Sequence, residues 1–133
     1  NKCSHLISEM PSNVFVSYQG EKDPSEVSNI FAKYHLFALP TLGENFGHVI
    51  IESLFAGTPV ILSNNTPWIP SDNWSLKVIP LSDFDKWIEY IDSFLNKFDS
   101  KSTRNDAVIY GKKLISQQNI YEKNVTLFDF VCS

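Results

Sequence analysis

Short apolar runs alternate with helical segments along the chain and predict its elements. Residues 14–18, 36–40 and 60–62 are rich in strand-forming residues, and residues 76–80 predict a short last strand. The run at 36–40 is continuously apolar, as in a parallel strand that is covered on both faces. Strands that alternate with helices predict an α/β fold, a doubly wound Rossmann-like parallel sheet with flanking helices.

Helical signals fill the intervals between these strands. Asp23 is the expected N-cap of a helix that begins at Pro24. The segment 46–56 is apolar nearly all round, which predicts a buried helix closed by Gly57. Three further helical stretches are expected: the tail of a helix at 3–10, an amphipathic helix at 84–98, and a helix with a weaker stripe at 103–118.

The chemistry lies between the strands at 36–40 and 60–62. Glu44 falls in the loop after the first of these strands, and Glu52 falls in the helix that follows. The helix N-terminus offers free N–H groups to an anion, and Gly47 lets a ligand approach the backbone. Helical side chains lean back toward the N-terminus, so two carboxylates can face one ligand at different depths. Carboxylates accept hydrogen bonds from vicinal hydroxyls, which indicates a sugar or ribose ligand.

Two residues of this helix have alternative interpretations. A lone acid among apolar residues needs a partner. From the helix alone, Glu52 can therefore equally be a ligand-binding acid or a capping or salt-bridge residue. His48 lies four residues earlier on the same stripe. A histidine can act as a general base, but nothing singles this one out, and covering of the helix end is favoured.

Composition narrows the class of protein. The 133 residues suit one domain with one core. No apolar run is long enough to span a bilayer, and the first residues do not resemble a signal peptide. The net charge of −4 argues against broad nucleic-acid binding. Cys3 and Cys132 have no metal-ligand spacing, which favours two reduced thiols in a cytoplasmic protein.

Three motifs together resemble a known signature. They are L-P-T at 39–41, E-x-F-G at 44–47, and E-S-L-x-A-G-T-P-V-I at 52–61. This combination is similar to the donor site of retaining glycosyltransferases with the GT-B architecture, of the group 1 or family 4 type. The resemblance implies that residues 1–133 are a single nucleotide-sugar-binding domain, the C-terminal half of a GT-B fold.

The resemblance also implies roles for single residues. Glu44 would be the catalytic-site carboxylate that contacts the hydroxyls of the donor sugar. The backbone N–H groups of Asn45, Phe46 and Gly47 would face the sugar or the diphosphate. Glu52 would hold the ribose hydroxyls of the nucleotide sugar. No metal and no further cofactor are implied, since the nucleotide sugar is the substrate.

The same resemblance sets expectations outside this site. Tyr18, Gln19 and Gly20 would end a strand near the nucleotide base, although a packed Tyr18 is the favoured interpretation. Trp68 would either line the donor pocket or pack against the domain. Arg104 is the only arginine and lies late in the chain.

Family members hold the donor diphosphate with an arginine and a lysine upstream, and they have an N-terminal acceptor-binding domain. Neither feature is found in this sequence. We therefore expect a fragment of a larger cytoplasmic enzyme of polysaccharide biosynthesis, inactive by itself. Peripheral membrane association of the full enzyme is compatible with these expectations.

Three other functions are compatible with parts of the pattern. Paired carboxylates also serve glycoside hydrolases, but the ribose position of Glu52 and the phosphate-binding character of the loop disfavour hydrolysis. A sugar-nucleotide epimerase or a glycogen-type phosphorylase would share the architecture. A non-catalytic α/β module that binds a partner or a nucleotide is the alternative from a different class.

Overall fold

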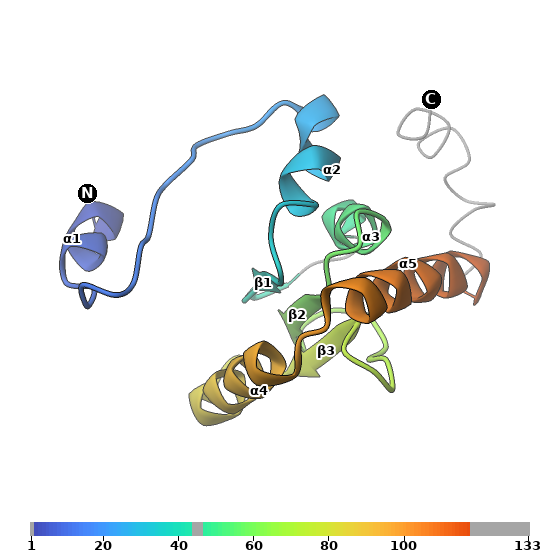
Figure 1. Ribbon diagram of the computed structural model, residues 1–133. Helices are drawn as coiled ribbons and strands as arrows, with labels where there is room; N and C mark the ends of the chain where they lie inside the picture. Colours follow the sequence, from blue (N-terminus) through green and yellow to red (C-terminus); the bar gives the residue numbers. More distant parts are fainter. Residues whose placement is uncertain (1, 44–46, 118–133) are drawn as a thin grey trace.

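The computed structural model describes residues 2–43 and 47–117. Figure 1 shows a small parallel sheet with helices on both sides and an N-terminal arm that extends away from it. The elements in chain order are α1 (Lys2–Ser8), α2 (Pro24–Phe31), β1 (Phe37–Leu39), α3 (His48–Phe55), β2 (Val60–Ser63), β3 (Leu76–Ile79), α4 (Phe84–Lys97) and α5 (Ser100–Gln117).

The described strands form one sheet in the order β1-β2-β3, and both pairings are parallel. Phe37 pairs with Val60, which in turn pairs with Leu76. The carboxyl ends of the three strands therefore meet at one edge of the sheet. This mixed architecture confirms the predicted Rossmann-like α/β fold class.

One face of the sheet carries the main core. Val60 and Leu62 of β2 pack with Leu54 of α3 and Leu114 of α5, and all four are buried. α5 approaches α3 closely at Gly111, where a Cβ would lie 3.1 Å from the Cβ of Leu54. Burial of this apolar surface is the main force that holds α3 in place, because each fully buried side chain of this size contributes about 1.5–3 kcal/mol.

α4 covers the opposite face at its β3 side (Figure 1). Its contact is aromatic, since Phe94 is buried and its ring lies 5.7 Å from that of Trp74 and 5.4 Å from that of Phe98. The sequence predicts one amphipathic stripe through Phe84, Trp87, Ile88, Ile91, Phe94 or Leu95, and Phe98. The structure divides this stripe, because Phe84 and Ile88 remain exposed while Phe94 is buried.

The predicted helix ends agree closely with the structure. Asp23 accepts a hydrogen bond from the N–H of Ser25 at 2.9 Å and is the N-cap of α2. α5 begins at Ser100, three residues before the expected start, because Asp99 caps it through the N–H of Ser102 at 2.8 Å. Its expected last residue, at position 118, lies outside the described residues.

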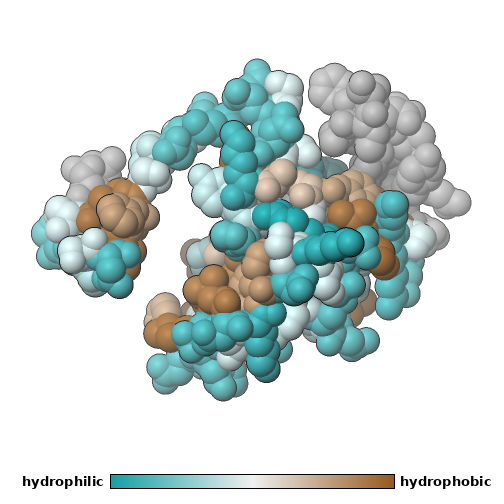
Figure 2. Space-filling view, in the orientation of Figure 1, coloured by the Kyte–Doolittle hydropathy of each residue, from teal (hydrophilic) through white to brown (hydrophobic). Residues whose placement is uncertain are grey.

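The predicted strand at residues 14–18 is wrong. The segment is extended, but no strand lies beside it in the described part of the chain, and a strand needs a partner for its backbone groups. Phe15 is 94% exposed and Tyr18 is 81% exposed, so the packed interpretation of Tyr18 is also wrong. Leu6 of α1 is exposed, and Figure 2 shows a brown patch at this helix, apart from the body of the molecule.

The hydroxyl of Tyr110 ties α5 to the loop after β2 and gives the fold a pH dependence. It donates to the carbonyl of Ile69 at 2.6 Å, and the side chain is buried. Burial raises the pKa of Tyr110, and the negative charge of Asp72 raises it further. Because the folded pKa lies above the unfolded value of about 10, ionisation favours the unfolded chain. The stabilising contribution is therefore complete below pH 10 and is lost as the pH rises toward the folded pKa.

We expect the free energy of unfolding to fall above about pH 10, and to fall less steeply in Tyr110→Phe. Urea denaturation at several pH values between 8 and 11.5 measures both slopes. Tyr90 leaves a residual slope in the variant, since burial raises its pKa as well. Identical slopes in the two proteins would contradict this role of Tyr110.

Candidate functional site

The N-terminus of α3 lies just beyond the carboxyl end of β1, where open parallel sheets bind ligands. Gly47 is the N-cap and is buried, with φ −69° and ψ 83°, and it has no side chain that could cap the helix. Its carbonyl accepts the N–H of Ile50 at 2.8 Å. The N–H groups of His48 and Val49 have no acceptor among the described residues. They therefore give this edge of the sheet the donors and the positive dipole end that favour an anion.

Hydroxyl groups fix the loop that enters this site. The Thr41 hydroxyl donates to the carbonyl of Gly43 at 2.9 Å and accepts the N–H of Gly43 at 3.2 Å. The Ser63 hydroxyl, at the end of β2, donates to the carbonyl of Thr41. The segment that follows β1 is thus joined to the end of β2.

Glu52 lies in the second turn of α3, because the helix begins at His48. Its side chain is half-buried between the buried residues Ile51 and Ser53. None of the hydrogen bonds or ion pairs among the described residues uses its carboxylate. The structural alternative, a capping or salt-bridge acid, therefore has no partner in the described part of the chain, and the carboxylate is available to a ligand.

Three of the five predicted site residues, Glu44, Asn45 and Phe46, lie outside the described residues. Their roles stay predictions. The structure does place Gly47 and Glu52 on one short helix at the expected edge.

The structure also places the other residues that the sequence analysis considered for the site. Trp68 is 5% exposed and belongs to the main core, so the packed alternative is the right one. His48 is half-buried at the first position of α3. Tyr18, Gln19 and Gly20 lie in the N-terminal arm rather than at the end of a strand.

Arg104 lies near the amino ends of β1 and β2, opposite the edge at which the candidate site lies. Its guanidinium donates to the carbonyl of Tyr34 at 3.1 Å and to that of Gly57 at 3.4 Å. These residues precede β1 and β2, whereas the α3 N-terminus follows β1. Arg104 therefore anchors α5 and does not face the candidate site.

Sequence reasoning did not single out Thr41 and Ser63 as residues that organise the site. A signal was present, because each is a small hydroxyl residue at the end of an apolar strand. Such positions meet at the ligand-binding edge of a parallel sheet. Their mutual hydrogen bond could not be inferred without the strand pairing.

Comparison with known proteins identifies the class to which this site belongs. The profile of the family described as glycosyl transferases group 1 matches residues 1–114. This match covers most of the chain, and the protein belongs to that family.

A similar protein is described as an uncharacterized 41.2 kDa protein in the cps region of Klebsiella pneumoniae. The two sequences are 30% identical over 91 residues, which are 67% of this chain and 25% of the relative. The chain therefore spans about a quarter of the relative's length. No solved structure matches this chain.

Among the helices of the described residues, none has the length and apolar character needed to cross a bilayer.

Proposed function

We propose that this chain is the donor-binding part of a retaining glycosyltransferase, which transfers a sugar from a nucleotide sugar to an acceptor. The observation that carries the proposal is that the first N–H groups of α3 and the carboxylate of Glu52 on the same helix both lack a partner among the described residues. Family membership supports glycosyl transfer in general. The relative in a cps region supports a role in polysaccharide biosynthesis.

In this proposal the N–H groups of His48 and Val49, which have no acceptor among the described residues, and the dipole of α3 face the negative diphosphate or the sugar. Asn45, Phe46 and Gly47 supply further backbone donors, and Glu44 contacts the sugar hydroxyls. Glu52 accepts hydrogen bonds from the ribose. The backbone N–H groups act mainly by positioning the nucleotide sugar and by stabilising the charge that develops on the leaving diphosphate.

Calorimetric titration with UDP, GDP, ADP and their sugar conjugates tests donor binding. We expect saturable binding of one nucleotide, with weaker binding of the others. Contacts to the base distinguish one nucleotide from another, whereas the helix N-terminus binds the phosphates that all of them share. Such selectivity would also name the donor nucleotide. Equal, strongly salt-dependent binding of all of them, or of inorganic phosphate alone, would contradict a specific donor site.

A further inference from the structure

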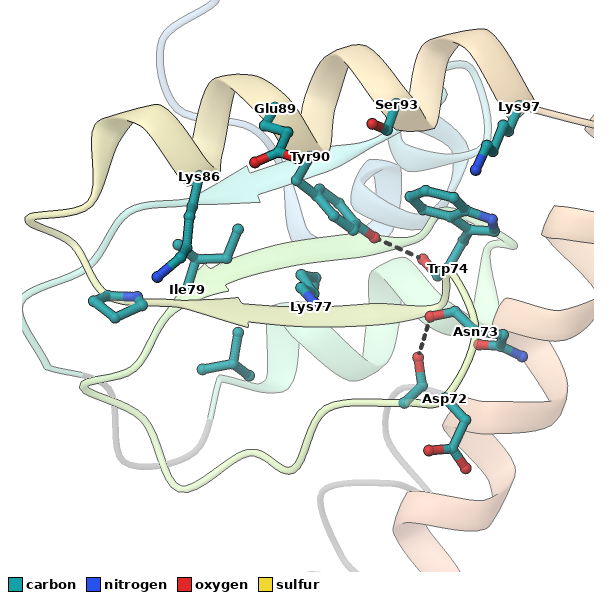
Figure 3. Close-up of a pocket in the computed structure, with 13 residues that line it drawn as sticks. Asp72, Asn73, Trp74, Lys77, Ile79, Lys86, Glu89, Tyr90, Ser93 and Lys97 are labelled. Carbon is teal, nitrogen blue, oxygen red and sulfur yellow. Dashed lines mark hydrogen bonds between the residues drawn. The ribbon is translucent and has the colours of Figure 1, made fainter.

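A cavity lies away from the α3 N-terminus, between α4 and the outer edge of β3 (Figure 3). We call it the α4 groove. Its volume is about 730 Å³, within the range of pockets that hold small ligands. Lys77, Val78 and Ile79 line it consecutively. Because their side chains alternate between the two faces of the sheet, a cavity lined by all three runs along the edge of the strand.

The backbone of β3 offers one open donor and acceptor pair to the groove. The N–H of Val60 donates to the carbonyl of Ser75 at 2.9 Å, so in a parallel ladder residues 75, 77 and 79 face β2. Leu76 therefore faces outward, and Ser71 occupies both of its backbone groups. Val78 also faces outward, and its N–H and carbonyl have no partner among the described residues.

Two half-buried aromatic rings form one wall. The rings of Trp74 and Tyr90 have centroids 5.2 Å apart, and the Tyr90 hydroxyl donates to the Trp74 carbonyl at 3.5 Å. Figure 3 shows both rings between α4 and the strand. Burial keeps the Tyr90 phenol neutral, because it raises the pKa of that group far above its usual value. The wall therefore adds apolar surface without negative charge, which suits the C–H face of a sugar ring.

Two lysines supply positive charge at these rings. The Lys77 ammonium lies 5.8 Å from the Tyr90 centroid, and the Lys97 ammonium lies 5.9 Å from the Trp74 centroid. Neither makes an ion pair with a described residue, whereas Lys86 is paired with Asp83 at 2.7 Å. Ammonium groups without a carboxylate partner are suited to a carboxylate or a phosphate on a ligand.

The remaining polar lining suits hydroxyl groups. The groove is also lined by Val78 and by the polar residues Ser71, Asp72, Asn73, Glu89 and Ser93. They combine donors and acceptors, as recognition of a polyhydroxylated ring requires. We propose that the α4 groove binds a pyranose sugar that carries a carboxylate or a phosphate. This site goes beyond the proposed function, because the groove lies apart from the donor site at the start of α3.

Nuclear magnetic resonance titration of the ¹⁵N-labelled chain tests this site directly. The probes are glucuronic acid, glucose 6-phosphate, neutral glucose and inorganic phosphate. We expect one or both anionic sugars to shift the Trp74 indole N–H and the Val78 amide saturably, and glucose to bind at least about fivefold more weakly. Binding of glucuronic acid alone assigns a carboxylate ligand, and binding of glucose 6-phosphate alone assigns a phosphate ligand.

Matched variants separate the groove from general charge effects. Replacing Lys77 and Lys97 together by glutamine should weaken binding of the anionic sugar roughly tenfold, and added salt should weaken it further. Replacing Lys112 and Lys113 of α5 by glutamine changes the net charge equally and should leave the affinity unchanged. Glu52→Gln should also leave it unchanged, so failure of the donor site and failure of this site are distinguishable.

Three results would overturn the proposal. One is the absence of saturable shifts at Trp74 and Val78 with either anionic sugar. Another is equal affinity for glucose or inorganic phosphate. The third is an equal loss of affinity in the Lys112 and Lys113 control.

Discussion

Replacing Glu52 by glutamine is expected to weaken binding of the preferred nucleotide by about 10- to 100-fold. Hydrogen bonds to a charged group contribute about 1.5–3 kcal/mol each, and glutamine keeps the shape while it removes the charge. The stability of the fold should change little, because no described residue hydrogen-bonds or ion-pairs with this carboxylate. Calorimetry gives the affinity, and urea denaturation gives the free energy of unfolding.

The 2′-deoxy analogue of that nucleotide isolates the contact. If Glu52 holds the ribose hydroxyls, the unmodified chain binds the analogue more weakly than the parent nucleotide, and Glu52→Gln no longer distinguishes the two. Glu26→Gln, on the exposed side of α2, is the matched control and should keep the discrimination. A Glu52→Gln variant that loses stability but keeps affinity and discrimination would instead assign Glu52 a structural role.

Replacing Gly57 by valine is expected to lower the free energy of unfolding by about 3–5 kcal/mol. Gly57 ends α3 with φ +78°, where a residue with a side chain is strained by about 1–3 kcal/mol. An added Cβ would also lie 3.2 Å from the Cβ of Arg104, so overpacking adds about 1–3 kcal/mol. Urea denaturation measures the sum, and Gly57→Ala should show a smaller loss.

Gly43→Val is the matched control for this change. Gly43 is not in the left-handed region, and a Cβ there would meet no atom of the described residues within 4 Å. We expect its effect on stability to stay within about 0.5 kcal/mol, as for an ordinary surface substitution. A similar loss in Gly43→Val and Gly57→Val would show that neither the backbone conformation nor the Arg104 contact is responsible.

The elements around the site could be predicted because their signals are local. Asp23 caps α2, and Gly57 and Pro59 end α3 before β2, as their residue types indicate. The strand at 14–18 has an equally good local pattern and failed, because strand formation depends on a neighbour that local propensity does not report. The same limit applies to α4, where spacing alone does not show which apolar residues the sheet covers.

The site itself was only partly predictable. The helix position of Glu52 follows from the order of strand, loop and helix, whereas the sequence did not identify Gly47 as the N-cap. The hydrogen bond from Ser63 to Thr41 and the α4 groove depend on pairing between segments distant in the sequence. The sequence did not decide whether Trp68 lines the donor pocket or packs in the core. Its core position follows from its packing with residues of α3 and α5.

Backbone amide mapping with the preferred nucleotide tests the central claim most directly. In the ¹⁵N spectrum of the chain, we predict the largest saturable shifts at Gly47, His48 and Val49, with smaller shifts at Thr41 and Ser63. Trp74 and Val78 in the α4 groove should not move. Shifts confined to the groove, or saturable binding that leaves the amides at the start of α3 unchanged, would contradict the placement of the donor site at this helix.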